Sequence, residues 1–196
     1  MIAPAAVTGV ILAGGRGRRM GGAIKAMLPI EGRTILERLV GALEPVCAEV
    51  IVSVRSLDQI DTPLRRVVDD IADAGPLAGI AAALAASARP WLIAVGGDMP
   101  DVRTDVLELL LAHAGPGVDA VAPLVAGLPE PLCAIYGARC LDAARRRLAE
   151  GRFKTSGLLT DEGLAVAWVG EHLVRAVDPD LRSLRNVNRP DDLARS

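Results

Sequence analysis

Short runs of aliphatic residues alternate along this chain with longer segments in which apolar residues recur at helical spacing. The run over residues 91–95 is nearly continuous, as in a strand that is buried on both faces. The predicted strands cover residues 10–12, 49–54, 66–68, 91–95, 120–125 and about 131–136. The predicted helices cover residues 34–46, about 74–88, 104–112 and 140–150. This alternation predicts a three-layer, Rossmann-like α/β fold with a mostly parallel central sheet.

A glycine-rich loop follows the first predicted strand. It contains closely spaced glycines and cations, namely Gly14, Gly15, Gly17, Gly21 and Gly22 with Arg16, Arg18, Arg19 and Lys25. Glycines allow backbone N–H groups to approach a ligand, and a run of such groups binds anions. The cations repel one another unless an anion lies among them. We therefore expect the loop to bind a polyphosphate.

Two common phosphate-binding motifs do not fit this loop. The dinucleotide fingerprint requires G-x-G-x-x-G, and the stretch from Gly15 to Gly21 is one residue too long. The P-loop requires Lys and then Ser or Thr directly after its second glycine, but Ala23 and Ile24 follow Gly22. The loop is therefore typical of neither a dehydrogenase nor a P-loop NTPase.

Polar residues also end other predicted strands, at the edge where open α/β sheets bind their ligands. Ser53 lies at the end of one strand, and Asp69 and Asp70 follow the next. Asp98 follows the central strand after two glycines, where a carboxylate has little use in packing. Mg²⁺ takes one or two carboxylates with substrate oxygens and water, so Asp98 is the candidate metal ligand. Asp101 is expected to cap the next helix.

Composition limits the classes of function. The 196 residues suffice for one domain with its own core, and 51% hydrophobic but only 2% aromatic residues predict a core of Ala, Val, Leu and Ile. A net charge of −2 provides no basic field for nucleic acid. No uncharged apolar run reaches the roughly 18 residues of a membrane span, and no signal peptide is expected, so the predicted location is cytoplasmic.

Cys47, Cys133 and Cys140 lack C-x-x-C spacing, which favours buried, reduced thiols.

The glycine-rich loop resembles the nucleotidyltransferase loop L-A-[GA]-G-x-x-x-R-M-G-x-x-K. The match in order and spacing includes Leu12, Ala13, Gly14, Gly15 and Arg19, and Lys25 follows one residue later than in the pattern. Further motifs are G-P-L-x-G at 75–79, D-x-P at 98–100 and N-x-N-x-P-x-D-L at 186–193. Together they make nearly the whole chain similar to the molybdenum cofactor guanylyltransferases.

The resemblance implies a nucleotidyltransferase fold and transfer of GMP from GTP to molybdopterin, with release of pyrophosphate. Mg²⁺ is the implied cofactor, with Asp98 as its ligand and Arg19 and Lys25 offsetting the charge of the triphosphate. The implied nucleotide-binding residues are Leu12, Ala13, Gly14, Gly15, Lys25, Ser53, Asp70, Gly75 and Asp98. Asn186 and Asn188 are expected on the acceptor side.

The same resemblance implies a single domain over residues 1–196, with the nucleotide bound by the N-terminal half and the acceptor by the C-terminal half. The implied partners are GTP and molybdopterin as substrates, and proteins that transiently hand over the cofactor. Neither nucleic acid nor a membrane is expected as a partner.

Three alternatives stay open. A cytidylyltransferase of the same fold tends to read L-A-A-G, and the missing methyl group at Gly14 leaves room for a larger purine, which favours GTP. Sugar-phosphate nucleotidyltransferases share the fold but lack the paired-Asn ending. A non-catalytic nucleotide-sensing module is the alternative of another class, and the presence of both Asp98 and Lys25 argues against it. The chain departs from the family at Ile24 and Ser53, where Asp and Asn are usual.

Overall fold

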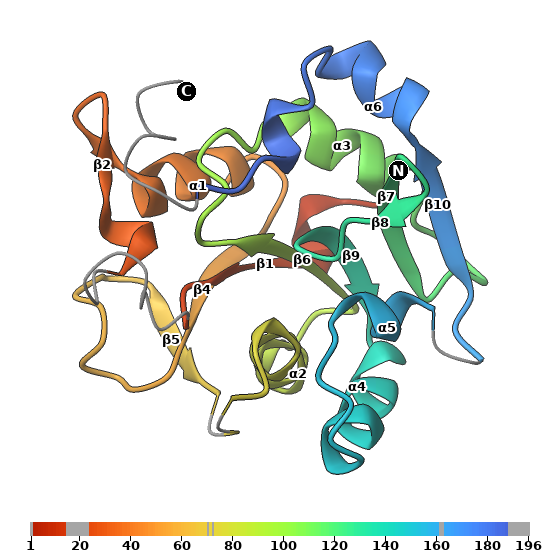
Figure 1. The fold of residues 1–196 in the computed structure, drawn as a ribbon, viewed down its shortest axis with the longest axis horizontal. Helices are drawn as coiled ribbons and strands as arrows, with labels where there is room; N and C mark the ends of the chain where they lie inside the picture. The colour runs from red at the N-terminus through yellow and green to blue at the C-terminus, as the bar shows by residue number, and fades with distance from the viewer. Residues whose placement is uncertain (1, 15–23, 70, 72, 161–162, 188–196) are drawn as a thin grey trace.

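The computed structural model describes residues 2–14, 24–69, 71, 73–160 and 163–187. Within these residues, eight strands form one sheet in the order β10-β7-β9-β6-β1-β4-β5, with β8 paired to β7 (Figure 1). The strands are β1 Val7–Leu12, β4 Glu49–Val54, β5 Arg65–Val68, β6 Trp91–Gly96, β7 Ala120–Val125, β8 Leu128–Pro129, β9 Cys133–Gly137 and β10 Val166–Gly170. A separate hairpin pairs β2 Pro29–Ile30 with β3 Arg33–Thr34.

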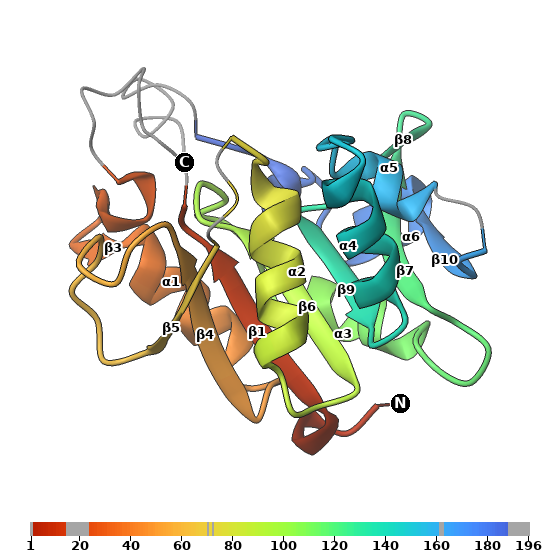
Figure 2. The same ribbon diagram turned by 90° about the horizontal axis from the view of Figure 1, so that it is seen from below.

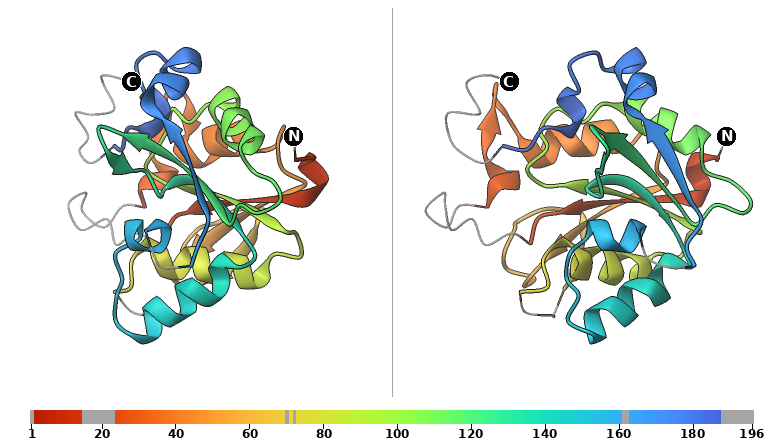
Figure 3. Two further views of the ribbon diagram at one scale, coloured as in Figure 1. Left: turned by 90° about the vertical axis from the view of Figure 1, so that its right-hand side faces the viewer. Right: turned by 45° about the vertical axis from the view of Figure 1, so that its right-hand side comes forward.

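Helices cover both faces of the sheet (Figure 3). One face carries α1 Ile35–Leu43, α3 Thr104–Ala112 and α6 Glu171–Val177. The other carries α2 Pro76–Ala86, α4 Cys140–Ala149 and α5 Ser156–Leu159. Short 3₁₀ helices are η1 Pro4–Ala6, η3 Lys25–Met27 and η4 Arg182–Leu184. The predicted three-layer α/β fold with a mostly parallel sheet is confirmed.

Successive residues of the central strands enter opposite cores. Ile11 and Ile93 belong to the core beneath α1 and α3, whereas Val10 and Leu92 belong to the core beneath α2 and α4. Strands that supply two cores must be apolar at every position, which explains their continuous aliphatic runs. β1 lies parallel to both β4 and β6, so the carboxyl ends of these three strands meet at one edge of the sheet.

Some elements differ from the prediction. β9 is antiparallel to both of its neighbours, β6 and β7, so it departs from the parallel direction of the other central strands. β10 and α6 were not predicted; β10 is an edge strand that is only partly buried, and α6 has only 7 residues. α1 ends at Leu43 rather than Val46: Glu44 keeps helical backbone angles, but Pro45 has no backbone N–H with which to continue the helix.

The three cysteines are buried and free, as expected. Burial raises the pKa of Cys47, Cys133 and Cys140 to about 12 in each case, so the thiols stay protonated near neutral pH. None of the helices within the described ranges has the length and apolar character needed to cross a bilayer.

A capping box begins α1, as the spacing of Thr34 and Glu37 predicts. The Glu37 backbone N–H donates to Thr34 Oγ1 at 3.1 Å, and Thr34 N donates to Glu37 Oε2 at 2.7 Å. These bonds satisfy donors that a helix start otherwise leaves unpaired. The helix therefore starts at a defined residue, and it begins directly after the β2–β3 hairpin.

We predict that Thr34→Ala lowers the free energy of unfolding by about 1 kcal/mol, because it removes the acceptor for Glu37 N. The melting temperature should fall by roughly 2–4 °C. Thr34→Ser keeps the hydroxyl and serves as the matched control. Equal urea midpoints for the two variants would show that the cap does not contribute to stability.

Candidate active site

The end of β1 is held by the two strands beside it. Ala13 N donates to the carbonyl of Ser53 at 2.9 Å, and Gly97 N donates to the carbonyl of Leu12 at 3.1 Å. A Cβ atom at Gly97 would lie 2.8 Å from that same carbonyl oxygen, which leaves no space for any side chain. Glycine is therefore required at 97 for the chain after β6 to cross so close to β1.

Two polar side chains hold the backbone that enters the glycine-rich loop. Gln59 Nε2 donates to the carbonyl of Ala13 at 3.1 Å, and Arg55 Nε donates to the carbonyl of Gly14 at 2.7 Å. Gln59 Oε1 in turn accepts from Arg55 N at 2.6 Å. Sequence reasoning missed Gln59, because it lies in a loop with no motif around it. These bonds fix the direction in which the loop leaves the sheet.

The space beside Gly14 is occupied by a carboxylate. A Cβ atom at Gly14 would lie 3.1 Å from Asp69 Oδ2, so alanine at this position would press on Asp69. The missing methyl group at Gly14 was expected to leave this space for a purine. In the structure the glycine accommodates Asp69, and it does not by itself distinguish GTP from CTP.

Ser53 lies under α2 rather than at an open surface. Its side chain is 1% exposed, and its hydroxyl has no hydrogen-bond partner among the described residues. A Cβ atom at Gly79 of α2 would lie 2.6 Å from Ser53 Oγ, so helix and strand are in close contact here. Figure 2 shows α2 lying over β1, with β4 and β6 to either side.

Gly75 begins α2 in a backbone conformation that other residues rarely adopt. It has φ 64° and ψ −157°, and Pro76 takes the first helical position. A Cβ atom at Gly75 would meet nothing within 4 Å, so the backbone angle and not a lack of space requires glycine. The first turn of α2 thus has an open surface beside it.

The central contact of the site joins Asp98 and Lys25. Asp98 lies in the turn after β6, and Lys25 begins η3 after the glycine-rich loop. Lys25 Nζ donates to Asp98 Oδ2 at 2.9 Å, and the side chains are 23% and 26% exposed. The ion pair brings together the predicted phosphate cation and the predicted metal ligand. Solvent access allows Asp98 to take up a cation and Lys25 a phosphate oxygen.

The C-terminal motif reaches the same turn. Val187 N donates to the carbonyl of Asp98 at 2.7 Å, and Val187 is buried. Asn186, the residue before it, is exposed beside this contact. Two motifs that are far apart in the sequence thus meet at Asp98.

Several predicted site residues lie outside the described residues. They are Gly15, Arg19, Asp70 and Asn188, together with Arg16 and Arg18 of the glycine-rich loop. Leu12, Ala13, Gly14, Lys25, Ser53, Gly75, Asp98 and Asn186 are described, on the strand ends and loops given above.

Glu130 is a second acidic residue near Asp98, and the sequence analysis missed it. Its Oε1 accepts from Leu132 N at 3.0 Å, and the carbonyl of Leu132 accepts from Gly96 N at 2.8 Å, which ties this segment to the end of β6. Burial raises the pKa of Glu130, the Leu132 N–H partly offsets this, and the charge of Asp98 raises the pKa further. A glutamate between Pro129 and Pro131 was the available signal.

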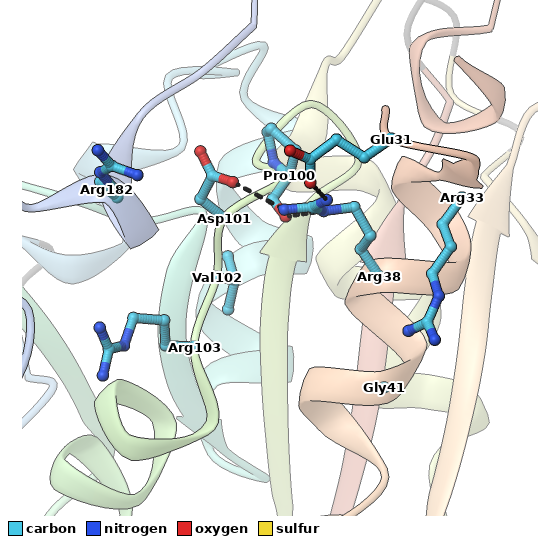
Figure 4. Close-up of a pocket in the computed structure, with 9 residues that line it drawn as sticks. All are labelled: Glu31, Arg33, Arg38, Gly41, Pro100, Asp101, Val102, Arg103 and Arg182. Carbon is cyan, nitrogen blue, oxygen red and sulfur yellow. Dashed lines mark hydrogen bonds and ion pairs between the residues drawn. The ribbon is translucent and has the colours of Figure 1, made fainter. Parts of the chain in front are cut away.

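Asp101 binds an arginine and caps no helix, contrary to the prediction. The residue before α3 is Arg103, which makes no side-chain cap. Asp101 Oδ1 accepts from Arg38 Nη2 at 3.2 Å, because the turn after β6 places Asp101 against α1. Arg38 also donates to the carbonyl of Pro100 at 3.1 Å and to Glu31 at 3.4 Å (Figure 4).

A pocket of about 620 Å³ adjoins this arginine. Its lining is mostly charged and consists of Glu31, Arg33, Arg38, Gly41, Pro100, Asp101, Val102, Arg103 and Arg182 (Figure 4). Arg103 pairs with Asp105 and Arg182 with Asp180, so acids offset most of the arginine charge. The pocket is thus distinct from the Asp98–Lys25 pair and lacks a concentrated positive charge.

Residues 9–161 match the family model described as the MobA-like NTP transferase domain. The chain belongs to this family. The molybdenum cofactor guanylyltransferase of Desulfosudis oleivorans is 34% identical over 192 residues, which cover 97% of this chain and 94% of that protein. A probable molybdenum cofactor guanylyltransferase of Methanosarcina acetivorans is 37% identical over 199 residues, covering 94% of this chain and 87% of that protein.

Solved structures show the same relationship. Molybdopterin-guanine dinucleotide biosynthesis protein A of Archaeoglobus fulgidus has a TM-score of 0.81 and 30% identity, covering 96% of this chain and 95% of that chain. A cytidylyltransferase of Thermus thermophilus has a TM-score of 0.65 at 19% identity, covering 94% of each chain, and shows the shared fold alone. The chain is thus a nucleotidyltransferase of the MobA-like family.

MobA-like transferases generally use a divalent metal. Within the described part of the chain, no three His, Cys, Asp or Glu side chains gather into a metal-binding group. A site with one protein carboxylate and substrate oxygens needs no such group, and the partly exposed carboxylate of Asp98 meets that requirement. The residues present therefore fit a metal that binds together with a nucleotide.

Glu130 should destabilise the fold as pH rises. Its folded pKa is raised, so between the unfolded and folded pKa values the folded state holds a proton that the unfolded state releases. Stability contributed by this group is therefore lost as pH rises through that interval. Glu130→Gln keeps an acceptor for Leu132 N without titrating.

We expect Glu130→Gln to melt above the wild-type protein at about pH 8 and level with it near pH 4. Calorimetry or circular dichroism across this range gives the measurement, with exposed Glu108→Gln as the control. A pH-independent difference between Glu130→Gln and wild type would contradict the assignment.

Proposed function

We propose that this protein transfers GMP from GTP to molybdopterin, giving the guanine dinucleotide form of the molybdenum cofactor and pyrophosphate. One observation carries the proposal: the Asp98–Lys25 pair lies at the carboxyl edge of β6, with the C-terminal motif bonded to Asp98 through Val187. In this proposal the two bonds bring a cation for phosphate, a carboxylate for metal and an acceptor-side segment to one edge of the sheet.

The reaction is a direct displacement. A terminal phosphate oxygen of molybdopterin forms a bond to the α-phosphorus of GTP, while the bond from that phosphorus to the bridging oxygen breaks and pyrophosphate leaves with the electron pair. Such phosphoryl chemistry depends mainly on positioning and on neutralising charge. No covalent enzyme intermediate is required.

The side chains divide this work. Lys25 exchanges its bond to Asp98 for a phosphate oxygen of the triphosphate, and Arg19 of the glycine-rich loop adds a second positive charge. Asp98 would hold Mg²⁺, which when bound screens the phosphate charge. Ala13 and Gly14, whose carbonyls are held by Gln59 and Arg55, set the path of the loop around the phosphates.

The nucleotide contacts extend along the N-terminal half of the single domain and the acceptor contacts along the C-terminal half. In this proposal Leu12, Gly15, Asp70 and Gly75 contact the nucleotide, whereas Ser53, which was expected to do so, is buried beneath α2 and supports the helix instead. Asn186 and Asn188 orient the acceptor beside Asp98. Proteins that deliver or receive the cofactor would approach the same edge.

The first test is a panel of nucleotides. Ligands that bind only the folded state raise its melting temperature with the logarithm of their concentration over Kd. We expect a rise with GTP and Mg²⁺, and none with CTP, ATP or UTP at equal concentration. A rise with CTP alone would make the protein a cytidylyltransferase, and binding without pyrophosphate release on adding molybdopterin would favour a nucleotide-sensing module.

Removing the carboxylate should abolish transfer. Asp98→Asn keeps the shape of the side chain but loses the charge that holds a divalent cation, so we expect pyrophosphate release to fall by about 100-fold or more. Exposed Asp142→Asn on α4 is the matched control. An Asp98→Asn enzyme with more than a tenth of wild-type activity would refute this role.

A further inference from the structure

The turn that carries Asp98 is held by a short C-terminal segment, residues 178–187. Ser183 Oγ accepts from Arg103 N at 3.2 Å and donates to the carbonyl of Asp101 at 3.3 Å. Val187 N donates to the carbonyl of Asp98 at 2.7 Å. The segment thus binds this turn at three backbone positions. In Figure 1 it runs back from α6 toward α1.

A buried carboxylate shapes that segment. Asp178 Oδ2 accepts from Ser183 N at 2.8 Å, and the exposed fractions of Asp178 and Ser183 are 2% and 0%. Between them, Leu181 has φ 54°, a left-handed conformation that is unfavourable for leucine. The bond from Asp178 closes the turn around Leu181 and directs the Ser183 hydroxyl at the Asp98 turn.

Arg38 of α1 also binds this turn. Its guanidinium binds the carbonyl of Pro100 and the carboxylate of Asp101 from α1. The backbone from Asp98 to Arg103 is therefore fixed between α1 and the C-terminal segment. Since a metal-binding carboxylate must be held within a fraction of an ångström, this backbone decides where the Asp98 side chain can point.

We propose that Asp178 and Ser183 are positioning residues for Asp98, so that metal-dependent nucleotide binding in the N-terminal half depends on this C-terminal pair. The inference rests on the proposed function for the role of Asp98 itself. Neither side chain contacts substrate in this account. Both act through the backbone of the Asp98 turn.

Ser183→Ala tests the proposal, with Ser87→Ala as the matched control. Ser87 also has a partly buried hydroxyl, which bonds Thr8 Oγ1 and accepts from Arg89 N, but it lies after α2 and away from the Asp98 turn. GTP affinity is measured by calorimetry with Mg²⁺ and with a chelator. Mg²⁺ should raise the affinity for GTP, and we expect this increase to be about tenfold smaller in Ser183→Ala than in the wild-type protein. The affinity measured without metal should be unchanged.

Steady-state kinetics supply the second readout. Ser183→Ala should raise the Mg²⁺ concentration for half-maximal transfer by about tenfold and lower kcat less, whereas Ser87→Ala should change neither. If Ser183→Ala does not fold, Asp178→Asn is the milder variant, because its neutral oxygen still accepts from Ser183 N. For Asp178→Asn, the increase in GTP affinity on adding Mg²⁺ should be roughly threefold smaller than in the wild-type protein.

The outcomes separate the two proposals. Wild-type protein with no Mg²⁺-dependent GTP binding would contradict the proposed function and the positioning role with it. Wild-type binding together with Ser183→Ala or Asp178→Asn values equal to those of Ser87→Ala would overturn the positioning role alone. Loss of affinity in both the presence and absence of Mg²⁺ would also overturn it, since that result indicates a general structural role.

Discussion

The close passage of Gly97 over the carbonyl of Leu12 is the constraint on which the site depends. Hydrogen bonding joins the two backbones at 3.1 Å, and no side chain fits at position 97. Because of this contact, the turn after β6 lies directly against the end of β1 instead of diverging from it. Asp98 then comes within 2.9 Å of Lys25, although the two are separated by most of the first half of the chain. The chemistry at this edge therefore follows from backbone contact between parallel strands.

A core of small aliphatic residues makes such close contacts possible. With aromatics at 2%, the layers are filled by Ala, Val, Leu and Ile, and α2 has glycine and several alanines on its buried side. A Cβ atom at Gly79 would already press on Ser53 and Leu12, so α2 lies as near to the sheet as its backbone permits. This closeness places the first turn of α2, with Gly75 before it, beside the ends of β1 and β4. The same packing buries Ser53, a residue that its position at the end of a strand had led us to expect at the nucleotide.

The sequence predicted most of the central strands because strands that contribute side chains to two cores have continuous aliphatic runs. It predicted the start of helices such as α1 because the capping residues lie next to that start in the sequence. It did not predict the direction of β9 or the edge strand β10, since pairing partners are chosen by packing and not by local pattern. The Asp98–Lys25 contact was anticipated through motifs on strand ends. Gln59, Glu130 and Ser183 were not, because a single polar residue in a loop has no periodicity and its role depends on distant backbone groups. Asp101 was assigned to a helix cap for the same reason, whereas its partner, Arg38, lies 63 residues earlier in the chain.

The anchoring of the Asp98 turn also sets an order of events during synthesis. Arg103 and Asp101 are bonded by Ser183, which is translated 80 and 82 residues after them. The strands and the glycine-rich loop leave the ribosome first, as N-terminal segments do. A nascent chain thus contains its glycine-rich loop well before residues 178–187 can bond the Asp98 turn. A chain without residues 178–187 would keep the strands β1, β4 and β6 but would lack the three hydrogen bonds that hold the Asp98 turn.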